Sequence, residues 1–332
     1  MIDYQLNPDI FNEDVVQEPI RAGFGKGLKA AGAANEKIVA LCADLTESTQ
    51  VHLFAEAYPE RFIQVGIAEQ NLVTVASGLA AAGKIPFASS YAAFNPGRNW
   101  EQIKTTIAIN DQPVKLVGGH AGIGVGPDGA THQMLEDIAL MRVMPNMTVV
   151  VPGDSLEAEK ATMAIAESNK PCYIRLSRPK TPIISTEESP FEIGVAYVLR
   201  EGSDISLLGT GTMTYQLLVA AKLLADKGIN AEVVHVPTIK PLDNNTIMAS
   251  ASKTGRLITA EEAQINGGFG SAVAELISEK LPTPLLRIGI MDRFGESGEP
   301  MELFEYFGLT GEHIAKKVED FVHNTSQYHR EY

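Results

Sequence analysis

The chain has 332 residues, of which 45% are hydrophobic and 20% charged, and this ordinary globular composition suits about two domains. The net charge is −14 and the lysines and arginines do not cluster. Nucleic acid and an anionic membrane are therefore not expected as partners, because both need a concentrated basic surface. The first 16 residues lack the features of a signal peptide, and no apolar run reaches the roughly 18 residues of a membrane span, so we expect a cytoplasmic protein.

In the first half of the chain, short β-branched runs alternate with alanine-rich segments. The predicted strands are 37–43, 84–90, 113–119, 147–152 and 172–177, and the predicted helices are 66–82, 98–110, 131–143 and 154–168. Continuous apolar strands that alternate with helices are typical of a parallel sheet covered on both faces. We therefore expect an α/β domain over residues 15–180, after an N-terminal extension of residues 1–14.

The segment "SRPKTPIISTEESP" is rich in proline and hydroxyl residues, which predicts a linker, placed at 181–191. The alternating pattern then resumes, with predicted strands at 204–211, 231–237, 256–262 and 285–290. A second α/β domain is expected over 192–325, followed by a tail of residues 326–332. The fold class is thus two doubly wound domains with largely parallel sheets. Cys42 and Cys172 lie in apolar runs without metal-type spacing, which predicts inert buried thiols.

The connection that follows strand 113–119 carries three polar side chains of interest. His120 follows the strand, His132 is expected where helix 131–143 begins, and Asp128 lies between them. The stretch "GVGPDG" (124–129) matches G-x-G-x-x-G, but its first glycine does not directly follow the strand as a dinucleotide site requires. Each histidine alone could be structural. Together with Asp128, at the carboxyl end of a parallel strand where such folds bind ligands, they indicate a site.

In "RFIQVGIAEQNLVTVASGLAAAG" (61–83), Glu69 opens an otherwise apolar helical run. Two interpretations stay open: a first-turn glutamate stabilised by the helix dipole, or a buried carboxylate aimed at a ligand. Arg175 and Arg178 are three positions apart on a strand and cannot face the same ligand, and Arg178 is the better anion candidate. Arg21 opens a helix, while Tyr91 and Phe94 are either core aromatics or a stacking platform for a flat ligand.

Six segments in order resemble the carboxyl-terminal half of transketolase, over nearly the whole chain. They are "DLTEST", "VGIAEQN", "SSYAAF", "HAGIGVGPDGATHQ", "RLSRP" and "EEAQINGGFGSAV". The resemblance implies thiamine diphosphate and Mg²⁺ as cofactors. It implies that Glu69 hydrogen-bonds N1′ of the aminopyrimidine, favouring the tautomer whose 4′-nitrogen can take a proton from C2 of the thiazolium ring. The segment "NPGRNWEQ" after Phe94 departs from the family by an insertion, so no third aromatic is transferred there.

The resemblance also implies roles for the other candidate residues. His132 and His120 join Glu69 as catalytic residues, with Phe94 and Tyr91 against the pyrimidine ring and Asp44 near the thiazolium. The implied substrate-binding residues are Arg21, Ser48, His120 and Arg178 for the phosphate and Asp128 for a sugar hydroxyl. No metal ligand is expected in this chain.

The GDG motif with which transketolase binds the diphosphate and metal is missing here. The resemblance therefore implies half a site, completed by a separate N-terminal, diphosphate-binding subunit in an α2β2 heterotetramer. The implied reaction is transfer of a two-carbon ketol unit between sugar phosphates, in the pentose phosphate pathway or specialised carbohydrate metabolism. Two alternatives stay open: the β subunit of a 2-oxoacid dehydrogenase E1-type enzyme, and a non-catalytic paralogue that acts as an interaction module.

Overall fold

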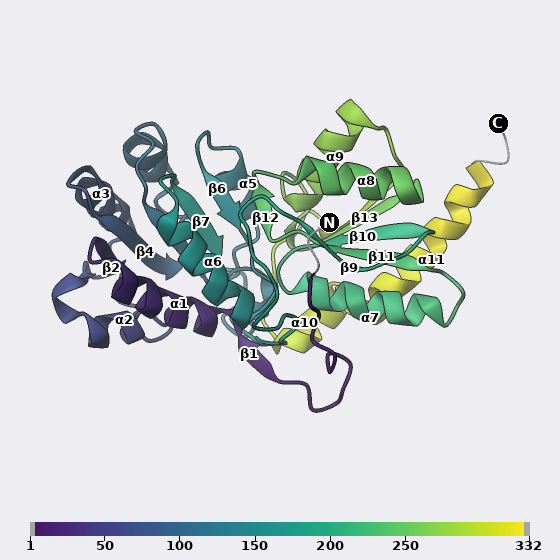
Figure 1. The fold of residues 1–332 in the computed structure, drawn as a ribbon, viewed down its shortest axis with the longest axis horizontal. Helices are drawn as coiled ribbons and strands as arrows, with labels where there is room; N and C mark the ends of the chain where they lie inside the picture. Colours follow the sequence, from purple (N-terminus) through teal and green to yellow (C-terminus); the bar gives the residue numbers. More distant parts are fainter. Residues whose placement is uncertain (1–3, 329–332) are drawn as a thin grey trace.

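The computed structural model describes residues 4–328, which form two α/β units side by side (Figure 1). The first is built on a seven-stranded sheet of order β12-β6-β7-β5-β4-β2-β3, parallel except for β12. Its strands are β2 (Ile38–Cys42), β3 (Phe62–Gln64), β4 (Ile85–Tyr91), β5 (Lys115–Gly119), β6 (Thr148–Val150), β7 (Cys172–Arg175) and β12 (Thr238–Lys240). The predicted parallel α/β architecture is confirmed.

Helices cover both faces of this first sheet, which explains its continuous apolar strands. On β5, Leu116 packs in the cluster that contains α3 (Glu69–Ala81) and α5 (Asp137–Arg142). Its neighbour Val117 packs in the opposite cluster, with α1 (Ile20–Ala34), α2 (His52–Ala57) and α6 (Ser155–Glu167). Successive residues of a strand point to opposite faces, so a sheet buried on both faces needs apolar residues at consecutive positions.

Helices α1 and α6 approach each other unusually closely, and glycines make this possible. A Cβ on Gly23 would lie 1.7 Å from the carbonyl oxygen of Ser155, and one on Gly27 would lie 2.7 Å from that of Glu159. Any side chain at these two positions would force the helices apart.

The second unit is a five-stranded sheet of order β14-β13-β10-β11-β9, parallel except for β9. Its strands are β9 (Tyr197–Arg200), β10 (Ile205–Gly209), β11 (Ala231–His235), β13 (Leu257–Gln264) and β14 (Leu285–Ile290). Its helices are α7 (Met213–Ala225), α8 (Asn244–Thr254), α9 (Phe269–Lys280), α10 (Pro300–Tyr306) and α11 (Gly311–Tyr328). The predicted tail starts inside α11, and residues 329–332, like 1–3 of the extension, lie outside the described residues.

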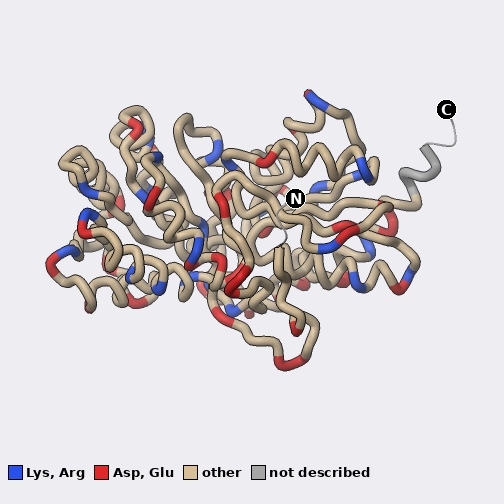
Figure 2. The backbone as a smooth tube through the Cα atoms, in the orientation of Figure 1, with Lys and Arg blue, Asp and Glu red and all other residues tan. Residues whose placement is uncertain are grey.

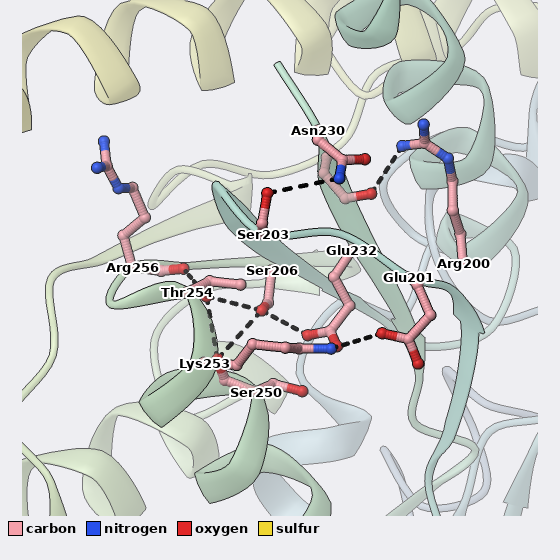
Figure 3. Close-up of polar contacts among 11 residues, drawn as sticks. Arg200, Glu201, Ser203, Ser206, Asn230, Glu232, Ser250, Lys253, Thr254 and Arg256 are labelled. Atoms are coloured by element: carbon pink, nitrogen blue, oxygen red, sulfur yellow. Dashed lines mark hydrogen bonds and ion pairs between the residues drawn. The ribbon is translucent and has the colours of Figure 1, made fainter.

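A polar cluster joins β10, β11 and α8 inside the second unit (Figure 3). The Ser206 hydroxyl donates to the buried Glu232 carboxylate at 2.6 Å, and it lies 2.8 Å from the hydroxyl of Thr254. Lys253 forms ion pairs with both Glu232 and Glu201, so the buried carboxylate is compensated. Buried charges are stable in this way when they are paired and hydrogen-bonded, and we read this cluster as structural.

Two structural elements differ from the predicted ones. The predicted helix 131–143 begins only at Asp137 in α5, and His132 lies in a turn before it, where the Thr131 hydroxyl contacts the His132 ring instead of capping a helix. The predicted helix 98–110 is a short α4 (Trp100–Gln102) that continues as a π-helix over Ile103–Ala108.

The segment expected as a linker is tied to the rest of the chain. It includes the end of β8 (Lys180–Pro182), which pairs with β1 (Gln17–Pro19), and the backbone of Ile184 accepts a hydrogen bond from that of Asn7. Strand β12, from the second half of the sequence, pairs with β6 in the first sheet. The two halves of the sequence are therefore interlocked.

Acidic and basic residues alternate along the backbone trace in Figure 2 and do not form separate blocks. Among the described residues, no helix combines the length and apolar character that crossing a bilayer requires. Cys42 and Cys172 are buried and free, as expected, and burial raises the pKa of both thiols.

Candidate active site at the carboxyl edge of the first sheet

The parallel strands of the first sheet bring most of the candidate residues to one edge. Tyr91 ends β4, His120 directly follows β5, and Arg178 follows β7 three residues after its end. Glu69 lies after β3 on the first turn of α3. Because the carboxyl ends of parallel strands meet at the same edge, residues far apart in sequence become neighbours there.

Glu69 is a deeply buried carboxylate at this edge, with a side chain that is 2% exposed. Its oxygen Oε2 accepts a hydrogen bond from Nη1 of Arg98 at 3.0 Å, and Oε1 accepts a longer one from the Ser90 hydroxyl at 3.4 Å. Leu72, Val73 and Ala76 of the same helix are buried beneath it. Glu69 is thus a buried carboxylate at the start of a helix, combining features of both interpretations left open by the sequence.

Four rings form an aromatic cluster at the same edge of the sheet. The Tyr91 ring stacks on the His120 imidazole with centroids 3.8 Å apart, and it lies 6.1 Å from the Phe94 ring. The His132 ring contacts Phe94 edge-on at 5.5 Å. The structure therefore brings together both histidines and both aromatics that the sequence singled out, with His132 contributed by the turn and not by a helix.

His120 is buried and is held in a neutral, defined tautomer. Nη1 of Arg21 lies 2.8 Å from Nε2 of His120, and since a guanidinium can only donate, Nε2 must accept and the proton resides on Nδ1. Burial, together with the charges of Arg21 and Arg178, lowers the pKa of His120 to about 3. Its Nδ1 has no partner among the described residues, so it remains a free donor. The left-handed backbone of His120 (φ 55°) is uncommon outside glycine and occurs preferentially at functional sites.

Arg21 and Arg178 place uncompensated positive charge beside His120. Both side chains are half-buried, and within the part of the chain that the structure describes neither pairs with a carboxylate. Burial and the nearby charge of Arg178 lower the pKa of Arg21, and Arg178 donates to the Val125 carbonyl. Two like charges kept close without a counter-ion are well suited to hold an anion.

Three predicted residues lie at the periphery of this cluster. Asp44 follows β2 with a left-handed backbone (φ 60°), and its N–H donates to the Gln64 side chain at 2.8 Å, while its own side chain is exposed. Ser48 is half-buried on the same connection, and Asp128 is exposed on the glycine-rich loop. The structure records no contact between any of these three side chains and the aromatic cluster among the described residues.

The glycine-rich loop that carries Asp128 is held by a residue for which no role was predicted. Buried Glu262, on β13, accepts from the backbone N–H of Gly124 at 2.7 Å and from the Thr212 hydroxyl at 2.8 Å. A Cβ on Gly122 would lie 2.3 Å from the same carboxylate, and the φ of +80° there also favours glycine. The second unit therefore fixes the shape of a loop in the first.

Arg175 is the structural member of the arginine pair. It is buried, donates to Asp137 at 2.8 Å through Nε, and reaches the Glu262 carbonyl at 2.8 Å through Nη2. The prediction that only Arg178 faces the ligand edge is consistent with this arrangement. The Glu262 contacts join residues 138 and 87 positions apart, and the Asp137 contact joins residues 38 apart. No local sequence pattern indicates these contacts.

Arg98, the partner of Glu69, was also not predicted. It lies in the "NPGRNWEQ" segment, which the sequence marked only as unusual. Its guanidinium carbon lies 4.6 Å from the centre of the Phe94 ring, so it touches two predicted site residues at once. The one available signal was a lone arginine close in sequence to an aromatic pair.

Comparisons with known proteins agree with this geometry. Residues 18–183 match the family model "Transketolase, pyrimidine binding domain", and residues 194–314 match "Transketolase, C-terminal domain". The chain is 46% identical over 306 residues to the "Putative transketolase C-terminal section" of Methanocaldococcus jannaschii, covering 91% of this chain and 96% of that protein. It is 44% identical over 286 residues to the 6-deoxy-6-sulfo-D-fructose transketolase subunit SqwH of Clostridium sp. (strain MSTE9), covering 86% and 89%.

A solved structure is similar over the same extent. The fold matches a split gene transketolase, described as an inactive β4 tetramer, with a TM-score of 0.85 at 45% identity, covering 91% of this chain and 97% of that one. A pyrimidine-binding domain followed by this C-terminal domain defines half of a thiamine-dependent transferase. The chain belongs to the transketolase family and corresponds to its C-terminal half, as found in split transketolases.

Proposed function

We propose that this chain is the C-terminal subunit of a split transketolase, which transfers a two-carbon ketol unit from a ketose phosphate to an aldose or aldose phosphate. The observation that carries the proposal is one sheet edge where a buried carboxylate, an aromatic face and two arginines that pair with no carboxylate among the described residues lie together. The carboxylate can bind a pyrimidine nitrogen, the aromatic face can stack against the pyrimidine ring, and the two arginines can bind a phosphate. They are contributed by Glu69, Phe94, Tyr91, Arg21 and Arg178.

The residues present fit thiamine diphosphate at its pyrimidine end. Glu69 is 2% exposed, and its one charged partner among the described residues, Arg98, is 50% exposed and therefore displaceable. The Phe94 ring lies against the same guanidinium, that of Arg98, which pairs with this carboxylate. When bound, the cofactor supplies the carbanion chemistry, while the protein supplies orientation and electrostatics. Glu69 would accept the hydrogen bond from the pyrimidine N1′, and Phe94 with Tyr91 would hold the ring in register.

The substrate would be held by the cationic corner. Arg21 and Arg178 would bind its phosphate, and the neutral His120 would donate from Nδ1. His132, which contacts the Phe94 ring, would face the reacting hydroxyls of the donor sugar. Ser48 would contribute to the phosphate site, Asp128 would contact a sugar hydroxyl, and Asp44 would lie near the thiazolium.

The remaining half of the site would come from a separate N-terminal subunit that binds the diphosphate and Mg²⁺, in an α2β2 assembly. Among the described residues, no three acidic, histidine or cysteine side chains are grouped as a metal site would require. The similarity to proteins described as a C-terminal section and as a transketolase subunit supports this division.

The test combines this chain with an N-terminal transketolase subunit and measures ketol transfer between sugar phosphates in a coupled assay. Activity is expected only from the mixture. Turnover by this chain alone, or an inactive mixture of folded subunits, would contradict the proposal.

Glu69→Gln, which keeps the shape but removes the charge, should lower kcat at least about 100-fold while leaving assembly intact. The matched control is Glu275→Gln on α9, which removes an exposed carboxylate paired with Arg142 and should leave kcat unchanged. Size-exclusion chromatography verifies assembly in both variants. A Glu69→Gln complex with normal turnover would remove Glu69 from the mechanism.

A further inference from the structure

Arg98 contacts both groups that an aminopyrimidine would need, the Glu69 carboxylate and the Phe94 ring. Its Nη1 donates to Oε2 of Glu69 at 3.0 Å, and its guanidinium carbon lies 4.6 Å from the Phe94 ring centre. A guanidinium is a flat, nitrogen-rich group that stacks on aromatic rings and donates to carboxylates. In these respects it resembles the edge of an aminopyrimidine, so the two groups compete for the same oxygen and the same ring.

The Arg98 side chain can leave without moving its backbone. The neighbouring Asn99 is buried and donates through Nδ2 to the Glu69 carbonyl at 2.9 Å, and buried Asn95 donates to the carbonyls of Ala88 and Val117. A Cβ on Gly97 would lie 2.1 Å from the Ala93 carbonyl, so the turn is also tightly packed. The Arg98 side chain itself is 50% exposed, and rotation of an exposed side chain is rapid.

The ion pair also has an energetic reason to exist before any ligand arrives. A buried carboxylate without a counter-charge is costly, and the remaining contact of Glu69, to Ser90 at 3.4 Å, is weak. Among the described residues, Arg98 is the one cation that pairs with Glu69.

We propose that Arg98 is a displaceable stand-in for the aminopyrimidine: it neutralises Glu69 and covers Phe94 in the unliganded subunit, and it swings out when the cofactor binds. This inference rests on the proposed function. It adds that cofactor affinity is set partly by the cost of breaking the Arg98–Glu69 pair, and that the pair keeps the separate subunit folded.

The experiment measures the Kd of thiamine diphosphate with Mg²⁺ by calorimetry on the assembled two-subunit complex, together with the Tm of the isolated chain. Arg98→Ala should tighten the Kd roughly two- to fivefold, the range expected for breaking a partly exposed ion pair. The Tm of the isolated Arg98→Ala chain should fall. Arg98→Lys keeps the charge but not the flat group and should fall between the wild type and Arg98→Ala in both measurements.

The matched control is Lys104→Ala, which removes an exposed positive charge six residues away that lies over Trp100 and not over Glu69. Its Kd should change less than about twofold, which separates displacement from the general attraction of an anionic ligand. If Arg98→Ala binds thiamine diphosphate with the same affinity as the wild type or more weakly, the proposal is overturned. If that variant does not fold, Arg98→Lys is measured instead, and a Kd equal to or weaker than that of the wild type overturns the proposal.

A crystal structure of the loaded complex gives the second readout. Arg98 should lie away from Glu69, and an Arg98–Glu69 pair that persists beside the bound cofactor would overturn the proposal. Failure of the proposed function looks different, because the wild-type complex would then bind no thiamine diphosphate at all.

Discussion

Glu69 and His120 are both buried, but the protein treats their charges in opposite ways. Glu69 is given a cation, Arg98, at 3.0 Å. His120 is surrounded by two cations and is kept neutral, with a pKa lowered to about 3 by burial first and then by Arg21 and Arg178. One edge of the sheet thus holds a compensated carboxylate and an uncharged imidazole that donates only from Nδ1.

The lowered pKa of His120 predicts an acid-sensitive fold. The unfolded histidine titrates near its ordinary pKa of about 6.5, so below that pH the unfolded chain binds a proton that the folded chain does not, and stability falls with falling pH down to about 3. We expect the free energy of unfolding of the wild type to fall by about 2 kcal/mol from this histidine alone when the pH drops from about 7 to about 5. His120→Gln, whose side-chain oxygen can still accept from Arg21, should not show this part of the loss. Urea denaturation at both pH values measures this.

The control for that measurement is His313→Gln, which alters a histidine with a 40% exposed side chain on α11. It should keep the pH dependence of the wild type. An equal loss of stability in wild type and His120→Gln would contradict the assigned neutral state of His120.

At the residue scale, the sequence indicated which side chains gather at this edge, but it did not indicate the residues that they pair with. Glu69, Tyr91, Phe94, His120 and Arg178 could be predicted from strand ends, aromatic spacing and resemblance. The ion pair between Arg98 and Glu69 could not, because it depends on how a loop turns back over a helix 29 residues earlier in the chain. Local patterns carry no information about such contacts.

The connection between β5 and α5 shows how elements of both units build one site. It starts at His120, passes through the glycines anchored by Glu262, and reaches α5 only at Asp137. The sequence predicted a helix from residue 131, but the side chain of Gln133 donates to the carbonyls of Ile123 and Glu296 and holds this stretch as a turn. Tertiary hydrogen bonds override helix preference here.

Strands were predicted more accurately than this connection. β2, β4, β5, β7 and β10 lie inside or within a residue of their predicted ranges, because two-sided burial imposes unbroken apolar runs. Five short strands of three or four residues were not predicted, because they pair at sheet edges and carry no apolar run of useful length: β1, β3, β8, β9 and β12.

Glu262→Gln tests the anchor of the glycine-rich loop. Both Glu262 oxygens accept hydrogen bonds, and because the Gly124 N–H can only donate, the amide NH₂ of glutamine must face the Thr212 hydroxyl, which then has to reverse its own hydrogen bond. We expect this weaker anchor to cost about 1 kcal/mol of unfolding free energy. Amide hydrogen exchange in residues 122–126 should accelerate. Glu279→Gln, an exposed position on α9, should change neither quantity. Unchanged exchange in the Glu262 variant would show that the loop holds its shape independently.

At the scale of the whole molecule, the two halves of the sequence do not correspond to two separable bodies. Strand β12 pairs with β6 of the first sheet, Glu262 anchors a loop of the first unit, and Arg175 reaches back to β13. Removing the second half would expose the edge of β6 and leave buried Arg175 without one of its partners.

The intact chain should therefore unfold as one cooperative unit. Calorimetry should give a single transition, with calorimetric and van't Hoff enthalpies in agreement. A fragment of residues 1–193 expressed alone should aggregate or lack a cooperative transition. Two resolved transitions in the intact chain, or a stable and cooperative 1–193 fragment, would contradict this interlocking.

The close contact of α1 with α6 has a consequence for redesign. Arg21 is the second residue of α1, and Gly23 and Gly27 fix how closely that helix packs on α6. These two glycines therefore set the position of the Arg21 guanidinium beside His120. A mutant library built around the candidate site should vary exposed positions such as Asp128 and leave both glycines unaltered. Changing either glycine would move helix α1 and shift Arg21. An altered activity could then not be attributed to the varied side chains.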